Sequence, residues 1–331
     1  MRCAVVGAGA WGTALAGLLR RNGHEVALWA HEPDVARSIE QNQENLRFLK
    51  GHTLPAGIRA STDLDSVVAE SQVVVFATPS MVLRGVALRA EPGIASGTPV
   101  VVATKGLETR TFALMTDVVA SEIPGSRVVA LSGPSFAAEV VRCQPTAVVL
   151  ASSDEAAAHG TQQIFNSAYF RTYTHNDVTG VELGGALKNV MAVATGIADG
   201  LGLGFNARAA LITRGLAEMT RLGTSLGARA STFAGLAGMG DLVLTCTGSL
   251  SRNREVGIEI GKGRTLDQVL GERETVAEGV VAAKSAQGLA LKQGVAMPIV
   301  EAVNRVLFEN QPPREAMVDL MTRELRAEAD R

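Results

Sequence analysis

The sequence predicts an α/β protein with a doubly wound, mostly parallel sheet in its first part and an all-helical second part. Three observations carry this prediction. Short β-branched runs alternate with helix-compatible stretches up to about residue 178, a glycine-rich turn follows the first run, and beyond residue 178 such runs thin out. At roughly 150 residues per domain, a chain of 331 residues is expected to form about two domains. We place them at 1–178 and 179–331.

The buried runs of the first part are short and apolar on all sides, which is typical of parallel strands covered on both faces. The stretches between them are long enough for crossover helices. The expected strands are Cys3–Val6, Glu25–Trp29, Val73–Ala77, Val100–Ala103, Val128–Leu131 and Ala147–Leu150.

The second part has the periodicity of helices. Apolar residues recur there at steps of three and four, which places them on one helix face. They are Leu183, Leu187, Val190, Ala194, Ile197 and Leu201. Similar stretches cover 207–222, 265–270, 275–293 and 297–309, and the charged tail from 323 to 331 is expected to fray.

Composition excludes several function classes. The chain has 31 Lys and Arg against 33 Asp and Glu, so it lacks the basic excess of a nucleic-acid or membrane-surface binder. Three scattered cysteines make no metal-ligand spacing with the five histidines, so we expect no metal site, no disulfide and a reducing, cytoplasmic setting. We predict no transmembrane segment and no signal peptide.

The glycine-rich turn Gly7-Ala8-Gly9-Ala10-Trp11-Gly12 lies between the first strand and a helix. In a Rossmann-like fold, the first glycine allows a tight turn and the second lets a pyrophosphate approach the backbone. The third lets the helix pack closely on the strand. We therefore expect this loop to bind a dinucleotide, whereas a plain glycine turn is the simpler reading of the pattern alone.

The second strand ends where the choice between NAD and NADP is made. An acidic residue at the Ala30 position would bind the ribose 2′-hydroxyl, and none is present there. His31, with Arg37 nearby, is able to accept a 2′-phosphate, while Glu32 stands one position late. The sequence favours NADP and leaves NAD open.

Two lysines stand in unusual surroundings. Lys105 follows a buried strand, and Lys188 is the only charged residue in the stretch from Leu183 to Ala198. A buried cation is costly unless it is paired or functional, although a long side chain that reaches solvent explains it too. We take both lysines as candidate functional groups, with Lys105 well placed to contact a ligand.

Two further segments offer groups for an anionic ligand. Ser132 to Ala137 follows a strand with glycine and hydroxyl donors, although an ordinary turn has the same composition. Asp241 precedes Ser251-Arg252-Asn253-Arg254, which combines a guanidinium with neutral donors as phosphate sites do. The alternative for the latter is a helix cap with solvated arginines.

Together these motifs resemble the bacterial NAD(P)-dependent sn-glycerol-3-phosphate dehydrogenase family. The resemblance runs essentially end to end and is most specific in ELGGALKNVMAVATGIADGLGLGFNARAALITRGLAEM at 182–219 and AGMGDLVLTCTGSLSRNREVG at 237–257. It implies reversible reduction of dihydroxyacetone phosphate, which supplies the glycerol backbone of phospholipids, and it is compatible with a homodimer.

The resemblance also implies residue roles. Lys188 is expected to be the general acid/base, with Lys105 and Asp241 beside it. Substrate contacts are expected from Lys105, Gly133, Ser135, Lys188, Asp241, Ser251, Arg252 and Asn253. Cofactor contacts are expected from Gly7, Gly9, Ala10, Trp11, Gly12, His31, Lys105, Ala137, Arg252, Val276 and Glu278.

Two other functions share some of these features. Dehydrogenases for 3-hydroxy acids or ketopantoate also combine the glycine loop, a helical second domain and a lysine. A non-catalytic dinucleotide sensor would need the loop but not a pair of lysines. Activity with phosphate esters rather than carboxylates distinguishes the first reading from both.

Overall fold

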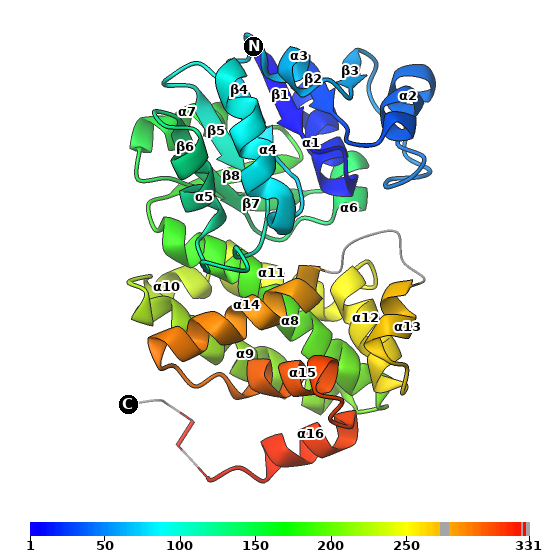
Figure 1. Ribbon diagram of the computed structural model, residues 1–331, viewed down its shortest axis with the longest axis vertical. Helices are drawn as coiled ribbons and strands as arrows, with labels where there is room; N and C mark the ends of the chain where they lie inside the picture. Colours follow the sequence, from blue (N-terminus) through cyan, green and yellow to red (C-terminus); the bar gives the residue numbers. More distant parts are fainter. Residues whose placement is uncertain (272–277, 326, 329–331) are drawn as a thin grey trace.

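The first part of the chain forms one eight-stranded sheet, as the computed structural model shows for residues 1–271, 278–325 and 327–328 (Figure 1). The strand order is β3-β2-β1-β4-β5-β6-β7-β8, so the chain winds outward in both directions from β1. The strands are β1 (Arg2–Val6), β2 (Glu25–Trp29), β3 (Ile58–Ser61), β4 (Val73–Phe76), β5 (Pro99–Val102), β6 (Arg127–Ser132), β7 (Thr146–Ala151) and β8 (Phe170–His175).

The six expected strands are confirmed, and the sheet is parallel except at one pair. β6 and β7 run antiparallel, with Leu131 opposite Leu150, and the sheet is therefore mostly parallel, as expected. The connection between them contains only the five-residue helix α6 (Ala137–Val141), whereas a parallel crossover normally needs a longer covering helix. β7 and β8 are parallel again.

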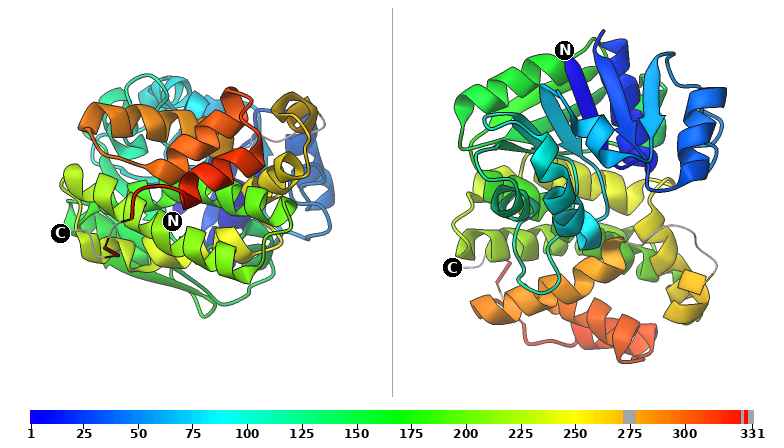
Figure 2. Two further views of the ribbon diagram at one scale, coloured as in Figure 1. Left: turned by 90° about the horizontal axis from the view of Figure 1, so that it is seen from below. Right: turned by 45° about the horizontal axis from the view of Figure 1, so that its top comes forward.

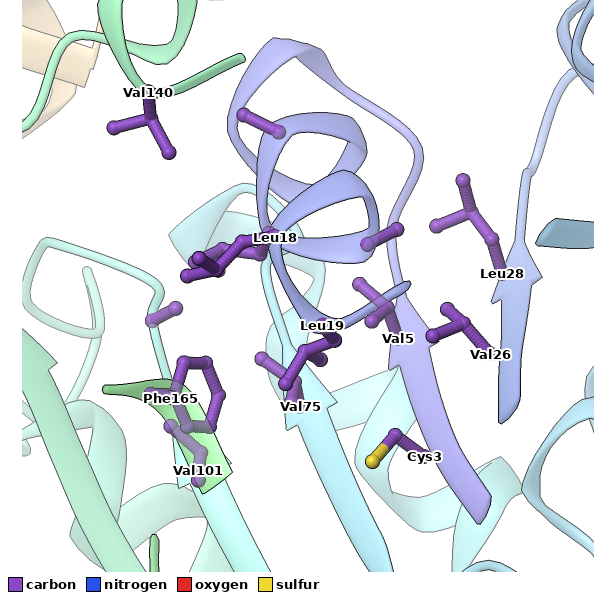
Figure 3. Close-up of a cluster of buried hydrophobic side chains, with 14 of the residues drawn as sticks. Cys3, Val5, Leu18, Leu19, Val26, Leu28, Val75, Val101, Val140 and Phe165 are labelled. Atoms are coloured by element: carbon purple, nitrogen blue, oxygen red, sulfur yellow. The ribbon is translucent and has the colours of Figure 1, made fainter. Parts of the chain in front are cut away.

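Helices cover both faces of the sheet. Alternate residues of β1 point to opposite faces, so Cys3 and Val5 join one core cluster while Ala4 and Val6 join the other. In the first cluster, Leu18 and Leu19 lie over the strand residues Val5, Val26 and Val75 (Figure 3). That face is covered by α1 (Ala10–Arg21), α2 (Pro33–Asn42), α6 and α7 (Glu155–Phe165), and the other by α3 (Leu64–Val68), α4 (Leu83–Ala90) and α5 (Met115–Glu122).

The helical half, residues 178–321, lies against one end of the sheet half, residues 2–175 (Figures 1 and 2). Its central helix α8 (Val178–Gly200) is buried continuously from Gly180 to Ala198, because it is mostly apolar and other elements pack against all of its sides. The other helices are α9 (Phe205–Ser225), α10 (Ala230–Phe233), the π-helix η3 (Leu236–Gly240), α11 (Asp241–Thr247), α12 (Arg252–Gly261), α13 (Leu266–Gly271), α14 (Glu278–Gln293), α15 (Pro298–Phe308) and α16 (Pro313–Met321).

Helices α8 and α12 approach unusually closely through glycines. A Cβ atom on Gly196 would lie 2.0 Å from the carbonyl oxygen of Arg254, and one on Gly257 would lie 2.2 Å from that of Val193. Any side chain at these positions would push the helices apart. The contact fixes α12 against the C-terminal part of α8.

No single helix among the described residues is long and apolar enough to cross a membrane. One bent pair, Ala230–Thr247 with Arg252–Gly261, meets the length and composition criteria only when its two parts are counted together.

Candidate active site

The glycine turn after β1 adopts the geometry that the sequence predicted. Gly7 has a φ of 113°, which favours glycine, and a Cβ on Gly12 would lie 1.8 Å from the Gly7 carbonyl oxygen. By contrast, apart from Gly9 itself and its neighbours along the chain, no atom of the described residues lies within 4 Å of the Cβ position of Gly9. The third glycine therefore allows close packing, and the second leaves open space at the start of α1.

Asn45 holds this turn in place, and the sequence did not single it out. Its buried amide donates to the Ala8 carbonyl oxygen at 2.8 Å and to Thr13 Oγ1 at 2.8 Å. One acceptor lies within the glycine turn and the other directly follows it, so the loop is fixed by a residue from outside its own sequence. Nothing in the local pattern around Asn45 predicts this role, because its partners lie more than one element away.

The residues around the turn fit a bound dinucleotide. α1 starts at Ala10 without a side-chain cap, so the first N–H groups of the helix are available to a pyrophosphate. Within the described part of the chain, the buried Trp11 Nε1 has no hydrogen-bond partner, and a ligand oxygen would satisfy it. His31 is exposed after β2, with its ring centroid 6.0 Å from that of Trp29.

The other expected cofactor residues lie around the same end of the sheet. Ala137 is the first residue of α6, and Glu278 is the first residue of α14. Ser80 Oγ donates to Glu278 Oε2 at 3.2 Å, which joins the two halves, and burial raises the pKa of Glu278. Val276 lies outside the described residues.

Lys105, Lys188 and Asp241 meet at one point between the two halves. Lys188 Nζ in α8 donates to Asp241 Oδ1 at 2.6 Å, and Lys105 Nζ after β5 donates to Asp241 Oδ2 at 2.5 Å. Asp241, the first residue of α11, is fully buried, and Lys188 is 8% exposed. One carboxylate between two ammonium groups leaves a net positive charge at a site that is largely shielded from water, and this favours an anionic oxygen nearby.

This arrangement changes the acidity of Lys105. Burial lowers its pKa most, Asp241 raises it, and the charge of Lys188 lowers it, and the net result is a pKa of about 8. A lysine with this pKa is able to exchange a proton near neutral pH. The positive charge of Lys105, and with it the net charge of the centre, therefore depends on pH near pH 8.

The turn after β6 is part of this centre. Lys105 Nζ also donates to the Gly133 carbonyl oxygen at 3.0 Å, and Ser135 Oγ donates to the same oxygen at 2.9 Å. Gly133 has a φ of 133°, and a Cβ there would lie 3.0 Å from the Cα of Val148. Ser132 Oγ is buried without a hydrogen-bond partner among the described residues, which makes it a further polar group open to a ligand.

The Ser251-Arg252-Asn253 segment caps a helix and also presents polar groups that suit a phosphate, so both interpretations of its sequence apply. Ser251 caps α12, with Oγ accepting from Arg254 N at 3.3 Å, as the simpler reading predicted. Asn253 donates to Asn189 Oδ1 at 3.0 Å and accepts from Gly279 N at 3.0 Å, which ties the turn to α8 and α14. Arg252 lies near enough to Glu278 to lower the pKa of that carboxyl against the larger effect of burial.

Arg254 is not solvated, contrary to the simpler reading. Its Nε donates to Asp199 Oδ2 at 2.7 Å, and the other oxygen of Asp199 accepts from Arg208. Asn189 was also missed, although it directly follows Lys188 and faces the same turn. Its position next to Lys188 was the one feature of the sequence that could have indicated a role for Asn189 in the site.

Comparisons with known proteins agree with this geometry. A family model described as the N-terminus of NAD-dependent glycerol-3-phosphate dehydrogenase matches residues 2–158, and its C-terminal counterpart matches 177–318. Glycerol-3-phosphate dehydrogenase [NAD(P)+] of Geobacter sp. (strain M21) is 52% identical over 99% of this chain and 98% of its own. The enzyme of that name from Syntrophotalea carbinolica is 52% identical over the whole of both chains.

A solved structure shows the same fold. The crystal structure of glycerol-3-phosphate dehydrogenase from Coxiella burnetii has a TM-score of 0.94 and 39% identity, covering 97% of this chain and 99% of that one. The resemblance seen in the sequence motifs is thus confirmed along the full chain. The chain belongs to the NAD-dependent glycerol-3-phosphate dehydrogenase family.

Proposed function

We propose that Lys188, Lys105 and Asp241 are the reaction centre for the activity of this family. The chain is an oxidoreductase that reversibly reduces dihydroxyacetone phosphate to sn-glycerol 3-phosphate with NADPH or NADH. The observation that carries the proposed assignment is the single buried carboxylate of Asp241, held by both ammonium groups at 2.5 and 2.6 Å.

The glycine turn would hold the dinucleotide, whose nicotinamide would supply a hydride for C2 of the substrate. The remaining work of the protein is to stabilise the developing alkoxide and to supply one proton. We assign the proton to Lys188, as general acid/base on the C2 oxygen, and electrostatic stabilisation to the Lys105 ammonium group. Asp241 holds both lysines at the site.

The phosphate end is assigned to Arg252 with Ser251 and Asn253, and the turn at Gly133 and Ser135 completes the substrate contacts. A guanidinium that grips a remote phosphate provides binding energy that orients the reacting carbon. Asn253 also anchors its own turn through Asn189, so the phosphate site and the lysine site share α8.

The cofactor is assigned to the glycine turn, with Gly7, Gly9, Ala10, Trp11 and Gly12 around the pyrophosphate. The exposed His31 leaves room for a 2′-phosphate, which supports use of NADP as well as NAD. The product supplies the glycerol backbone of phospholipids. The three cysteines are free thiols, which supports a cytoplasmic location. We also propose that the protein forms a homodimer.

Replacement of the proposed acid/base tests this assignment. Lys188→Ala should lower kcat for dihydroxyacetone phosphate by about 100-fold or more, because the proton donor is lost. The dissociation constant for NADPH should stay unchanged, since the glycine turn is untouched. Both quantities come from steady-state kinetics and a fluorescence titration with NADPH.

A second variant separates binding from chemistry. Arg252→Ala should mainly raise the KM for dihydroxyacetone phosphate, because a charged phosphate contact is lost. Normal turnover by Lys188→Ala would contradict the assignment of the base, and an unchanged KM in Arg252→Ala would contradict the phosphate site.

A further inference from the structure

The segment from Ala103 to Leu114 leaves the sheet half and enters the core of the helical half. Leu107 is 3% exposed and belongs to the hydrophobic cluster built by α8, α9, α12, α14 and α15. Phe112 and Leu114 pack against the same cluster, and a Cβ on Gly288 of α14 would lie 2.4 Å from Phe112 Cζ. The segment that carries Lys105 is therefore wedged between the two halves.

Glu108 is the polar centre of this segment. Its backbone N–H donates to the Ala113 carbonyl oxygen at 3.0 Å, and its own carbonyl accepts from Phe112 N at 2.9 Å. Its side chain accepts from Thr111 Oγ1. These contacts close the segment into a compact loop with Glu108 at its base.

Arg84, near the start of α4, binds this carboxylate with both arms of its guanidinium. Arg84 Nε donates to Glu108 Oε1 at 2.6 Å, and Nη2 donates to Oε2 at 3.0 Å. Nη1 also donates to Ser121 Oγ at 3.1 Å and to Glu122 of α5. The loop is thereby tied to two helices of the sheet half.

Only two residues separate Glu108 from Lys105, and the backbone between them has little freedom to move. Gly106 has a φ of 153°, and a Cβ there would lie 2.9 Å from Ser80 Oγ. Lys105 Nζ itself has two partners to satisfy, Asp241 and the Gly133 carbonyl oxygen. A shift of the loop base is therefore passed on to the ammonium group.

The pair is partly shielded from water, because the Glu108 side chain is only 17% exposed while that of Arg84 is 41% exposed. It therefore contributes to stability as well as to the geometry of the loop. A bidentate arginine–carboxylate contact fixes the relative orientation of its partners. In the same contact, Arg84 lowers the pKa of Glu108, so the pair stays charged over the working pH range.

We propose that Arg84 and Glu108 are positioning residues that hold Lys105 at the reaction centre. This inference rests on the proposed role of Lys105. Neither residue touches the centre itself, so both act only through the placement of the Lys105 ammonium group.

A double-mutant cycle tests the proposal. Glu108→Gln keeps the size of the side chain and removes its charge, and it should lower kcat by about tenfold, since small misplacements of catalytic groups are costly. In a Lys105→Ala background the same substitution should cause no further loss, because the group that it positions is gone. The measurements are kcat, the NADPH dissociation constant and the melting temperature of all four proteins.

A matched ion pair elsewhere in the sheet half provides the control. Arg127 binds Asp154 through Nε at 2.7 Å and Nη2 at 2.9 Å, its side chain is 37% exposed, and it touches no site loop. Arg127→Gln should leave kcat unchanged. Should Glu108→Gln fail to fold, Arg84→Lys replaces it, which keeps the charge but loses the fork.

The outcomes separate the two proposals. An equal loss of kcat from Glu108→Gln in both backgrounds, no loss in either, or an equal loss from Arg127→Gln would overturn the positioning role. Full activity of Lys105→Ala alone would instead contradict the proposed function of Lys105. The pH profile adds a second readout: Glu108→Gln should move the limb near pH 8 that Lys105→Ala abolishes.

Discussion

At the scale of single residues, the glycine turn shows that a missing side chain has different uses at neighbouring positions. Gly12 lacks a Cβ because the Gly7 carbonyl oxygen occupies that space, at 1.8 Å from the Cβ position. Gly9 lacks one although no described atom is near. The first absence serves packing, and the second leaves room for a ligand.

This difference predicts two distinct phenotypes. Gly9→Ala should keep the melting temperature of the wild type, because its φ of −66° suits alanine, and should weaken NADPH binding by about tenfold or more. Gly12→Ala should instead lower the free energy of unfolding by about 3 kcal/mol, because the added methyl group overpacks the turn. Calorimetric titration and thermal unfolding measure both, and unchanged NADPH affinity in Gly9→Ala would contradict the cofactor site.

Part of the site was predictable at this scale and part was not. Lys188 stood out because a lone charge in an apolar helix needs a reason, and Asp241 stood out through its motif. The ion pairs of Asp241 with both lysines could not be predicted from the sequence, because Asp241 lies 53 residues from Lys188 and 136 from Lys105. Asn45 was missed altogether, since a buried asparagine has no local signature and only the fold brings it to the glycine turn.

At the scale of elements, the strands that are buried on both faces could be predicted from the sequence, and the less buried edge strands could not. The six inner strands were predicted because they are apolar on both faces. The two edge strands were missed: β3 carries Arg59, and β8 alternates Phe170 and Thr172 with exposed polar or aromatic residues. The reversed direction of β7 was also missed, because a strand's residue pattern does not encode its direction.

The α8–α12 contact gives an element-scale prediction. Gly257→Ala should destabilise the protein by about 1–3 kcal/mol, because its Cβ would meet the Val193 carbonyl oxygen at 2.2 Å. It should also raise the KM for dihydroxyacetone phosphate, since α12 begins at Arg252. Chemical denaturation and steady-state kinetics measure the two effects.

A second helical glycine provides the matched control. Gly160 lies inside α7, and within the described part of the chain no atom outside its own helix turn lies within 4 Å of its Cβ position. Gly160→Ala should therefore keep or raise the free energy of unfolding, by up to about 1 kcal/mol through helix propensity. Equal destabilisation by both substitutions would show that the close approach of α8 and α12 is not what makes Gly257 necessary.

At the scale of the whole molecule, the candidate site depends on both halves. The sheet half supplies the glycine turn, Lys105 and the turn at Gly133, all at the carboxyl ends of its parallel strands, where α/β sheets bind ligands. The helical half supplies Lys188 and Asp241. The halves are joined directly at the site by the Lys105–Asp241 ion pair.

Other contacts between the halves surround this ion pair. Ser80 in the sheet half donates to Glu278, and Glu182 of α8 accepts from Thr116 N at 3.1 Å. Burial raises the pKa of Glu182 to about 7, so this carboxyl exchanges its proton near neutral pH where the halves meet. The sequence predicted two parts and their order, but not these contacts, because each joins residues far apart along the chain.

The most direct test of the central claim is the oxidation of NADPH, and separately of NADH, by the purified protein with dihydroxyacetone phosphate. The absorbance of the reduced nicotinamide follows the reaction, with ketopantoate as the carboxylate comparison. The account predicts rapid oxidation with dihydroxyacetone phosphate alone, and the ratio of kcat/KM for the two cofactors then measures the preference set near His31. Bound NADPH that is not oxidised with dihydroxyacetone phosphate, or is oxidised only with ketopantoate, would contradict the account.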